Sequence, residues 1–525
     1  MAARPYGSDH LTALVIIPQH RHWRSAGTLA FFRATMNLTN PFCDADGDKL
    51  REECGVFGAI NATDAAAATA LGLHALQHRG QEATGIVSFD GREFYNRRGM
   101  GQVAENFSSA EAIAELPGFM AVGHVRYSTT GGSGLRNVQP LYAELAGGGF
   151  AVGHNGNISN AQTLRDDLVS RGAIFQSTSD TEVIIHLVAT SRYPTITDRL
   201  VDALRLLEGA YALIVMTKEG MIACRDPLGI RPLVMGRIGD ATVFASETVA
   251  FDVVGAEFIR EVEPGELVRV DFDGNVDSLH PFGNHRARPC IFEHVYFSRP
   301  DSVFAGRSVY EARKAIGEQL ARENPVEADL VVPVPDSGVP AAIGYAQASG
   351  IPFELGIIRS HYVGRTFIQP SDGARHAGVK RKHNANRGLV EGKRIVLIDD
   401  SIVRGTTSMQ IVEMMRDAGA TEVHFRVASP PTAHSCFYGV DTPERSKLLA
   451  ARMELEPMRE FIKADSLAFV SIDGLYRAVN GADRDSAAPQ FCDACFTGQY
   501  PTTLTDLERR ESQLAQLSLP VDKVA

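Results

Sequence analysis

RIVLIDDSIVRGTTS, residues 394–408, is the stretch that decides the fold of this 525-residue chain. Residues 395–398 form an unbroken apolar run of mostly β-branched side chains, which is typical of a strand buried on both faces of a parallel sheet. Asp399 and Asp400 follow where such a strand reaches its carboxyl edge, and small hydroxyl residues then lead through Gly405 into a helical pattern. The stretch therefore predicts a strand, a polar turn and a helix of a parallel α/β sheet.

The turn after this strand has the chemistry of a sugar-phosphate site. Unpaired N–H groups and the positive dipole end at a helix N-terminus can bind a phosphate monoester, and adjacent carboxylates can hold ribose hydroxyls or a hydrated Mg²⁺. The simpler interpretation is an ordinary strand, turn and helix with acidic caps. The whole string resembles the signature with which type I phosphoribosyltransferases bind phosphoribosyl pyrophosphate (PRPP), and DDSIVRGTTS resembles the glutamine PRPP amidotransferase family in particular.

That resemblance implies roles for two turns. It implies that Asp399 and Asp400 bind the ribose, and that Ser337, in the PDSG turn at 335–338, lies near a Mg²⁺ that the same two aspartates hold. As an alternative, PDSG is simply a good turn. The residues implied to bind PRPP through the 5′-phosphate turn are Ser401, Ile402, Val403, Arg404, Gly405, Thr406 and Thr407.

Residues 361–388 carry six Lys and Arg side chains in an otherwise acidic chain and show little apolar periodicity. A run of this length inside a compact domain is usually either disordered or a functional lid. The concentration of positive charge favours a lid that closes over a polyanion such as PRPP, with Lys380 among its contacts. A solvated basic loop is the alternative.

Composition limits the class of protein. A chain of 525 residues with 44% hydrophobic and 22% charged residues is expected to form at least two globular domains. The formal charge of −11 argues against a nucleic-acid partner, although it leaves room for a local basic patch. No apolar run approaches the length of a membrane-spanning helix. Seven cysteines are an odd number and do not resemble a secreted disulfide framework, so a cytoplasmic location is expected.

A second candidate site begins at Cys54, where residues 52–60 read EECGVFGAI, an apolar strand pattern that opens with a thiol. Such a cysteine can be a buried small hydrophobe. The segment, however, resembles the N-terminal-nucleophile glutamine amidotransferases, in which a leader is removed and the cysteine becomes residue one. An α-amino group has an ordinary pKa of about 7.7–8.0 and can then act as base for its own side chain. Residues 1–53 would be that leader, and a natural start at Met36 is an alternative explanation for the first 35 residues.

Later segments resemble the rest of that glutamine site. The resemblance implies that Arg79 lies at the site and that Arg126 binds the substrate α-carboxylate through its planar fork. It implies that Asn155 and the Gly156 N–H form an oxyanion hole, and that Asp180 binds the α-ammonium group. Each residue also has a simpler reading as a surface arginine, a turn or a helix cap. Their order downstream of a matching cysteine favours the site.

The alternation of helix and strand patterns between Thr181 and about Asp273 predicts an α-β-β-α sandwich of two antiparallel sheets. A helix is expected over 197–207, and strands are expected over 211–216, 233–238, 242–246 and 266–271. A linker rich in Pro, Gly and Arg follows near 280–289. We therefore expect an N-terminal-nucleophile glutaminase domain at 54–285, a type I phosphoribosyltransferase domain with a parallel sheet at 286–480, and a tail with a terminal helix at 481–525.

Four cysteines lie in the second half of the chain: Cys290, Cys436, Cys492 and Cys495. The last two form a C-x₂-C pair, which fits zinc, iron–sulfur and redox sites equally. Their surroundings resemble the branch of the family that carries a [4Fe–4S] cluster, and zinc or four free thiols are the alternatives. A cluster would tie the start of the second domain to the tail and would be structural. Cys43 matches no ligand position.

The family resemblance implies an enzyme that makes 5-phosphoribosylamine, glutamate and pyrophosphate from PRPP, glutamine and water at the entry to purine synthesis, with ammonia channelled from Cys54 to PRPP. It implies one Mg²⁺ and one [4Fe–4S] cluster per subunit, inhibition by purine nucleotides, a homotetramer, and neither a nucleic-acid nor a membrane partner. A PRPP-sensing repressor is the first alternative, but it would need a basic DNA-binding module. A glutaminase with another acceptor, as in asparagine or glucosamine-6-phosphate synthesis, is the second.

Overall fold

The computed structural model describes residues 51–52, 54–127, 134–359 and 383–510, all within the compact unit 47–525. In this part of the chain, no helix has both the length and the apolarity that crossing a membrane requires. The predictions for Lys380, for Cys43, for the start at Met36 and for most of the leader and of the basic lid lie outside the described residues.

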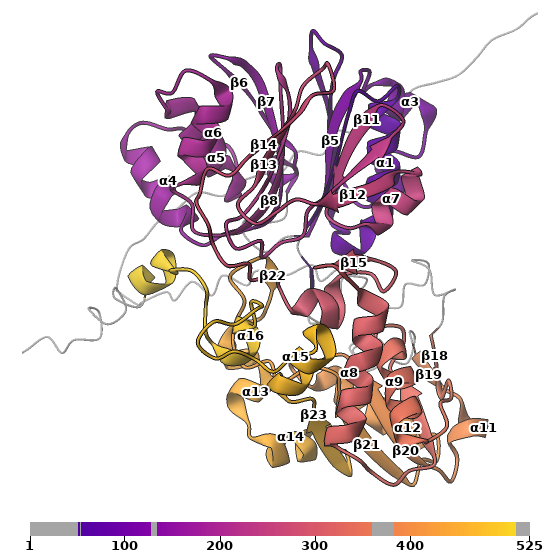
Figure 1. The fold of residues 1–525 in the computed structure, drawn as a ribbon. Coiled ribbons are helices and arrows are strands. Elements are labelled where there is room, and N and C mark those ends of the chain that lie inside the picture. The colour runs from indigo at the N-terminus through magenta and orange to yellow at the C-terminus, as the bar shows by residue number, and fades with distance from the viewer. Residues whose placement is uncertain (1–50, 53, 128–133, 360–382, 511–525) are drawn as a thin grey trace, which may run out of the picture. The chain divides into compact units, whose positions relative to one another are not determined.

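The first half of the described chain forms two antiparallel sheets, as the alternating pattern predicts (Figure 1). The seven-stranded sheet has the order β12 (Glu257–Glu261), β10 (Val234–Ile238), β11 (Ala241–Ala245), β2 (Gly55–Ile60), β5 (Met120–Arg126), β3 (Ala83–Phe89) and β4 (Phe94–Met100). The six-stranded sheet has the order β14 (Val276–Leu279), β13 (Leu267–Val270), β9 (Gly220–Arg225), β8 (Gly209–Thr217), β7 (Gly148–Ile158) and β6 (Leu141–Leu145).

The two sheets pack face to face around a shared apolar core that includes Val56 and Val122 from one sheet and Ile214 from the other. Helices α1 (Ala65–Ala75) and α7 (Val249–Val254) cover the outer face of the seven-stranded sheet. Helices α4 (Ala161–Ser170), α5 (Thr181–Thr190) and α6 (Ile196–Leu204) lie on the other outer face (Figure 1). The predicted α-β-β-α sandwich is therefore confirmed, although α6 ends three residues earlier than expected.

The second half contains a four-stranded parallel sheet in the order β17 (Leu330–Pro333), β20 (Arg394–Asp399), β21 (Glu422–Val427) and β23 (Ser466–Phe469). The apolar run in β20 is buried on both faces, as its composition predicts. Helices α8 (Val309–Glu323), α9 (Val339–Ser349) and α15 (Ile472–Asn480) pack on one face. Helices α12 (Thr406–Asp417) and α14 (Leu455–Ile462) pack on the other.

The tail shares a core with the parallel-sheet half and also contacts the sandwich. Phe491 and Leu504 are buried in the same apolar cluster as Tyr476 of α15. Further along, the Asp506 carboxylate accepts the N–H groups of Gln162 and Thr163 at the first turn of α4, at 2.8 and 2.9 Å. Residues 505–510 are helical, in agreement with the expected terminal helix as far as the structure describes it.

Candidate active sites

Cys54 lies directly before β2, opposite the end of β5 (Gly55 pairs with Val125), and its side chain is buried. Its N–H donates to the carbonyl of Arg79 at 3.1 Å, and its Sγ lies 3.7 Å from the carbonyl oxygen of Tyr127. Its φ of +69° falls in the left-handed region, which is uncommon for a residue with a Cβ and clusters at functional sites. The thiol therefore lies at the end of an interior strand of the seven-stranded sheet, in an unusual backbone conformation.

Asn155 reaches the same strand end from the other sheet. It lies on β7, fully buried, and its Nδ2 donates to the Ser246 hydroxyl at 3.2 Å. Ser246 in turn exchanges hydrogen bonds with the backbone of Val56, two residues from the thiol. Gly156 follows with a φ of +145°, and an added Cβ would lie 2.1 Å from the Ala210 carbonyl oxygen, so only glycine fits there. Ser246 was not assigned a role from sequence, because one serine after a strand carries no local signal.

Asp180 and Arg126 are both buried next to these segments. One oxygen of Asp180 accepts the Ile158 N–H at 3.0 Å, which holds the carboxylate at the end of β7, and the other accepts the Thr181 N–H at 2.9 Å. Arg126 ends β5 and lies 3.7 Å from the Glu82 carboxylate. Asp180 thus caps helix α5, as the simpler interpretation of the sequence expects, and it also contacts β7.

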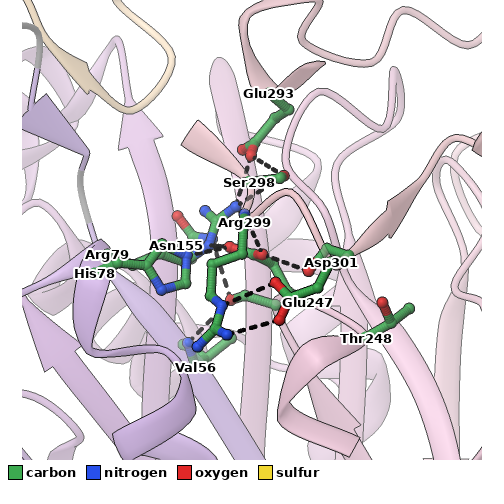
Figure 2. Close-up of polar contacts among 12 residues, drawn as sticks. Val56, His78, Arg79, Asn155, Glu247, Thr248, Glu293, Ser298, Arg299 and Asp301 are labelled. Carbon is green, nitrogen blue, oxygen red and sulfur yellow. Dashed lines mark hydrogen bonds and ion pairs between the residues drawn. The ribbon is translucent and has the colours of Figure 1, made fainter. Parts of the chain in front are cut away.

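Arg79 is fully buried, and its guanidinium contacts two buried carboxylates (Figure 2). One is Glu247, which follows Ser246, and the other is Glu293, to which Arg79 Nη2 donates at 2.6 Å. Glu247 and Glu293 have no predicted role from sequence, because no local pattern shows that these two carboxylates meet Arg79. Because the guanidinium of Arg79 is already paired with two carboxylates, its role differs from that of an arginine whose guanidinium pairs with a substrate.

The predicted PRPP residues gather at the carboxyl edge of the parallel sheet. Asp399 is the last residue of β20, and both it and Asp400 are buried. The turn after the neighbouring strand β17 contacts the same edge, because the Val334 N–H donates to the Ile398 carbonyl at 2.8 Å. Ser337, half-buried, lies in that turn. The sheet therefore brings Ser337 and the two aspartates to one edge.

The turn 401–405 leads into α12, and its side chains divide into two kinds. Ile402 and Val403 are buried in the apolar cores, so these two residues can offer a phosphate only their backbone groups. Gly405 has a φ of +81° and directly precedes the helix. The polar residues of the predicted set at this turn, Ser401, Arg404, Thr406 and Thr407, are half-buried or exposed.

Cys290, Cys436, Cys492 and Cys495 line one cavity, together with mainly apolar residues and the Arg231 side chain. Backbone hydrogen bonds join the segments of Cys290 and Cys492: the Ile291 N–H donates to the Cys492 carbonyl at 3.1 Å, and the Cys492 N–H donates to the Pro289 carbonyl at 2.9 Å. Burial raises the pKa of the Cys290 thiol to about 12. Within the described ranges, no group of three or more His, Cys, Asp or Glu side chains is arranged to hold a single metal ion.

His124, on β5, provides a pH-dependent prediction. It is fully buried, its Nε2 lies 3.0 Å from the His154 carbonyl oxygen, and burial lowers its pKa to about 3. In the folded protein, His124 therefore stays neutral as the pH falls from 6.5 to about 3, whereas in the unfolded chain the same side chain binds a proton over this range. Between pH 6.5 and about 3, the free energy of unfolding should fall by up to about 1.4 kcal/mol per pH unit from this group.

Urea unfolding at pH 6.5 and 5.5 measures that slope for the wild type and for His124→Asn. The variant should lose less stability between the two pH values, whatever its stability at pH 6.5. Equal slopes for the two proteins would show that His124 is not the group responsible.

Comparison with known proteins adds to this geometry. A glutamine amidotransferase domain model matches residues 124–253, and a phosphoribosyl transferase domain model matches residues 301–432. The chain is 58% identical over 479 residues to the amidophosphoribosyltransferase of Rhizobium etli, covering 90% of this chain and 96% of that one. It is 51% identical over 456 residues to the Bacillus subtilis amidophosphoribosyltransferase, covering 87% and 95% of the two chains. A solved structure of glutamine PRPP amidotransferase from B. subtilis, complexed with ADP and GMP, superposes with a TM-score of 0.81 at 50% identity, over 86% of this chain and 98% of that one.

Proposed function

Because the chain belongs to the amidophosphoribosyltransferase family, we propose that it divides one reaction between a glutaminase site at Cys54 and a PRPP site at Asp399 and Asp400. The enzyme converts PRPP, glutamine and water into 5-phosphoribosylamine, glutamate and pyrophosphate, the first step of purine biosynthesis. The observation that carries this function is the similarity over nearly the whole chain to relatives of that activity, with both domains present. The repressor and the glutaminase with another acceptor are therefore set aside.

At the glutaminase site, the Cys54 thiol attacks the carboxamide carbon of glutamine, and its proton passes to the α-amino group that removal of the leader sets free. Ammonia then leaves, and water hydrolyses the thioester to glutamate. The Asn155 amide nitrogen carries two hydrogens, one of which is bound to Ser246. The other, together with the Gly156 N–H, stabilises the oxyanion. The linkage of Asn155 through Ser246 to the strand that follows Cys54 supports this assignment.

The amino-acid end of glutamine is bound by Arg126, which pairs with the α-carboxylate, and by Asp180, which pairs with the α-ammonium group. Both side chains are buried beside the segments that carry Cys54 and Asn155, so their charges act in a region of weak solvent screening. Arg79, predicted as a third contact, can line the site only with its backbone while its guanidinium stays paired with Glu247 and Glu293.

At the second site, ammonia attacks ribose C1 from the face opposite the departing pyrophosphate, as positive charge develops on the sugar. Asp399 and Asp400 hold the ribose hydroxyls, and the backbone N–H groups of the turn 401–407 bind the 5′-phosphate. Ser337, Asp399 and Asp400 would hold a Mg²⁺, which would supply positive charge to offset that of the leaving pyrophosphate. Mg²⁺ commonly binds through one or two carboxylates plus substrate phosphates, so this small donor set is sufficient. Lys380 is proposed as a further PRPP contact from the basic segment.

The cysteine cavity is the proposed site of a structural [4Fe–4S] cluster held by Cys290, Cys436, Cys492 and Cys495. The four thiols line one cavity, and four cysteine thiolates are the ligand set of a [4Fe–4S] cluster. The Tyr438 N–H donates to the Cys436 sulfur at 3.3 Å, a contact common for ligating thiolates. Iron and acid-labile sulfide analysis of anaerobically purified protein should find four of each per chain, and protein without iron but with full activity would reject this site.

The leader is tested by intact mass analysis of purified active enzyme. A chain that begins at Cys54 is the expected result. Fully active protein with residues still attached before Cys54 would show that the α-amino group is not the base.

Three further properties stay proposals. ADP and GMP, which are bound in the related B. subtilis structure, are proposed to inhibit this enzyme. The test is to titrate each nucleotide in a turnover assay, and unchanged turnover at millimolar levels would reject the inhibition. A homotetramer is proposed. Sedimentation of the enzyme as a monomer at working concentration would contradict this. A cytoplasmic location, expected from the cysteine content, would be contradicted by fractionation that places the enzyme in another compartment.

The function itself is tested by stoichiometry. Purified enzyme with PRPP, glutamine and Mg²⁺ should release glutamate and pyrophosphate in equal amounts. Glutamate release without pyrophosphate when all substrates are present would mean that PRPP is not the acceptor.

A further inference from the structure

Four charged side chains form a buried network next to the segment that carries Cys54. It consists of Arg79 and Glu247 from the sandwich, Glu293 from the segment after the linker, and Arg231 (Figure 2 draws the first three). Arg79 contacts both carboxylates, and Arg231 Nη2 lies 2.9 Å from the second oxygen of Glu293. All four side chains are at most 2% exposed.

The network is balanced in charge, with two guanidinium groups and two carboxylates. Burial alone would raise the pKa of Glu293, but Arg79 and Arg231 more than offset this and lower it. Likewise, burial opposes the ionisation of Glu247, but Arg79 and His78 hold its pKa well below the ordinary value. Removing one partner of such a buried set leaves an uncompensated charge, so the geometry of the set is strongly determined.

One end of the network reaches the nucleophile. The carbonyl of Arg79 accepts the Cys54 N–H at 3.1 Å, and the backbone of Gly55 packs against the Arg79 side chain, whose Cδ would lie 3.4 Å from an added Cβ. The position of this carbonyl is thus fixed by a side chain whose guanidinium cannot move without breaking two buried ion pairs. Any shift of Arg79 changes where the Cys54 nitrogen is held.

The other end belongs to the segment that enters the second domain. Glu293 begins a π-helical turn, Glu293–Phe297, three residues after Cys290, and accepts the Ser298 hydroxyl at 2.6 Å. Arg313 of α8 fixes this turn by donating to the carbonyls of His294 and Ser298 at 2.9 and 2.7 Å. Glu247 contacts the same segment, since it accepts the Arg299 N–H at 2.9 Å.

We propose that Glu293 is a positioning residue of the glutaminase: through Arg79 it orients the Cys54 nitrogen, so that hydrolysis of glutamine depends on the segment leading into the PRPP-binding domain. This inference rests on the proposed function, in which that nitrogen becomes the α-amino base. The physical reason is that a base or nucleophile displaced by about 1 Å can lose about 100-fold in rate. The second domain would thereby control ammonia production without touching glutamine.

The test is Glu293→Gln, which keeps shape and removes one charge. Glutamine-dependent synthesis should fall at least about 10-fold, while ammonium-dependent synthesis and the KM for PRPP stay within about twofold. The pH profile for alkylation of Cys54 by iodoacetamide should also shift, because the nitrogen that shares its proton is displaced. Loss of stability alone would lower both activities together and leave this profile unchanged.

Glu266→Gln is the matched control, since Glu266 is also a buried carboxylate of the sandwich paired with an arginine, Arg260, at 2.7 Å. It should change neither the ratio of the two activities nor the alkylation profile. If Glu293→Gln does not fold, Ser298→Ala keeps the charge and removes the 2.6 Å hydrogen bond to Glu293 and the 3.5 Å contact from Arg79 Nη2, and it should lower the same ratio to a smaller extent.

Two outcomes separate the inference from the function on which it rests. If Cys54→Ala retains glutamine use, the proposed function fails. If Cys54→Ala abolishes glutamine use but neither Glu293→Gln nor Ser298→Ala changes the ratio of activities or the alkylation profile, the positioning role alone is overturned.

Discussion

Replacing Cys54 by alanine should abolish glutamine-dependent synthesis of 5-phosphoribosylamine while ammonium salts still support it. The thiol is the proposed nucleophile that releases ammonia, so its loss should remove the glutaminase half-reaction, for which the expected reduction is about 10⁴-fold or more. The proposed PRPP residues lie on a different sheet, one face of which has an apolar core of its own, and the loss of one buried sulfur beside β2 should not change them.

Both routes are measured in one assay of pyrophosphate release, with glutamine or with ammonium chloride as the nitrogen source. Cys224→Ala is the matched control, because Cys224 is a fully buried thiol on β9 that packs in an apolar core and belongs to neither proposed site. It should retain both routes. Simultaneous loss of both routes in Cys54→Ala, with the control active, would mean that the two sites are not separate.

Replacing Asp399 by alanine should impair both routes. The carboxylate is 2% exposed at the carboxyl end of β20, and in the proposed role its charge would act on the ribose in a region of weak solvent screening. Its loss should reduce synthesis from either nitrogen source by about 100-fold or more, a size typical for the loss of one preorganised electrostatic contact. Pyrophosphate release at saturating ammonium chloride is the measurement.

Asp329→Asn serves as the control for Asp399→Ala. Asp329 precedes the neighbouring strand β17 and accepts the Arg394 N–H at 2.9 Å, at the amino end of the same sheet. Its replacement should weaken one half-buried ion pair and leave PRPP turnover nearly unchanged. Normal turnover in Asp399→Ala would refute the role assigned to that residue, and an equal loss in both variants would indicate damage to the sheet instead.

Much of the fold could be read from local sequence. The strand β20 and the strands of the sandwich are buried, and buried strands leave a recognisable pattern of apolar residues in the sequence. Asp399 and Cys54 could be found because they stand at the ends of such strands within recognisable motifs. The four cysteines were found by residue type, although only the structure shows that they line one cavity.

The supporting residues could not be found in that way. Glu247 and Glu293 meet Arg79 across 168 and 214 positions of sequence, and Ser246 meets Asn155 across 91. A buried ion pair depends on the packing of distant elements, and glutamate residues are frequent in any chain. The structure was therefore needed to show that the arginine expected at the glutamine is held by two carboxylates.

The transfer of ammonia between the two sites is tested most directly by an isotope competition. The enzyme is given PRPP, glutamine labelled with ¹⁵N in the amide, and an excess of unlabelled ammonium chloride, and the ¹⁵N content of the 5-phosphoribosylamine is measured by mass spectrometry after trapping. If ammonia from Cys54 passes to the PRPP site without entering solvent, the product nitrogen will be mostly ¹⁵N. Product labelled only to the extent of the mixed ammonium pool would contradict the transfer.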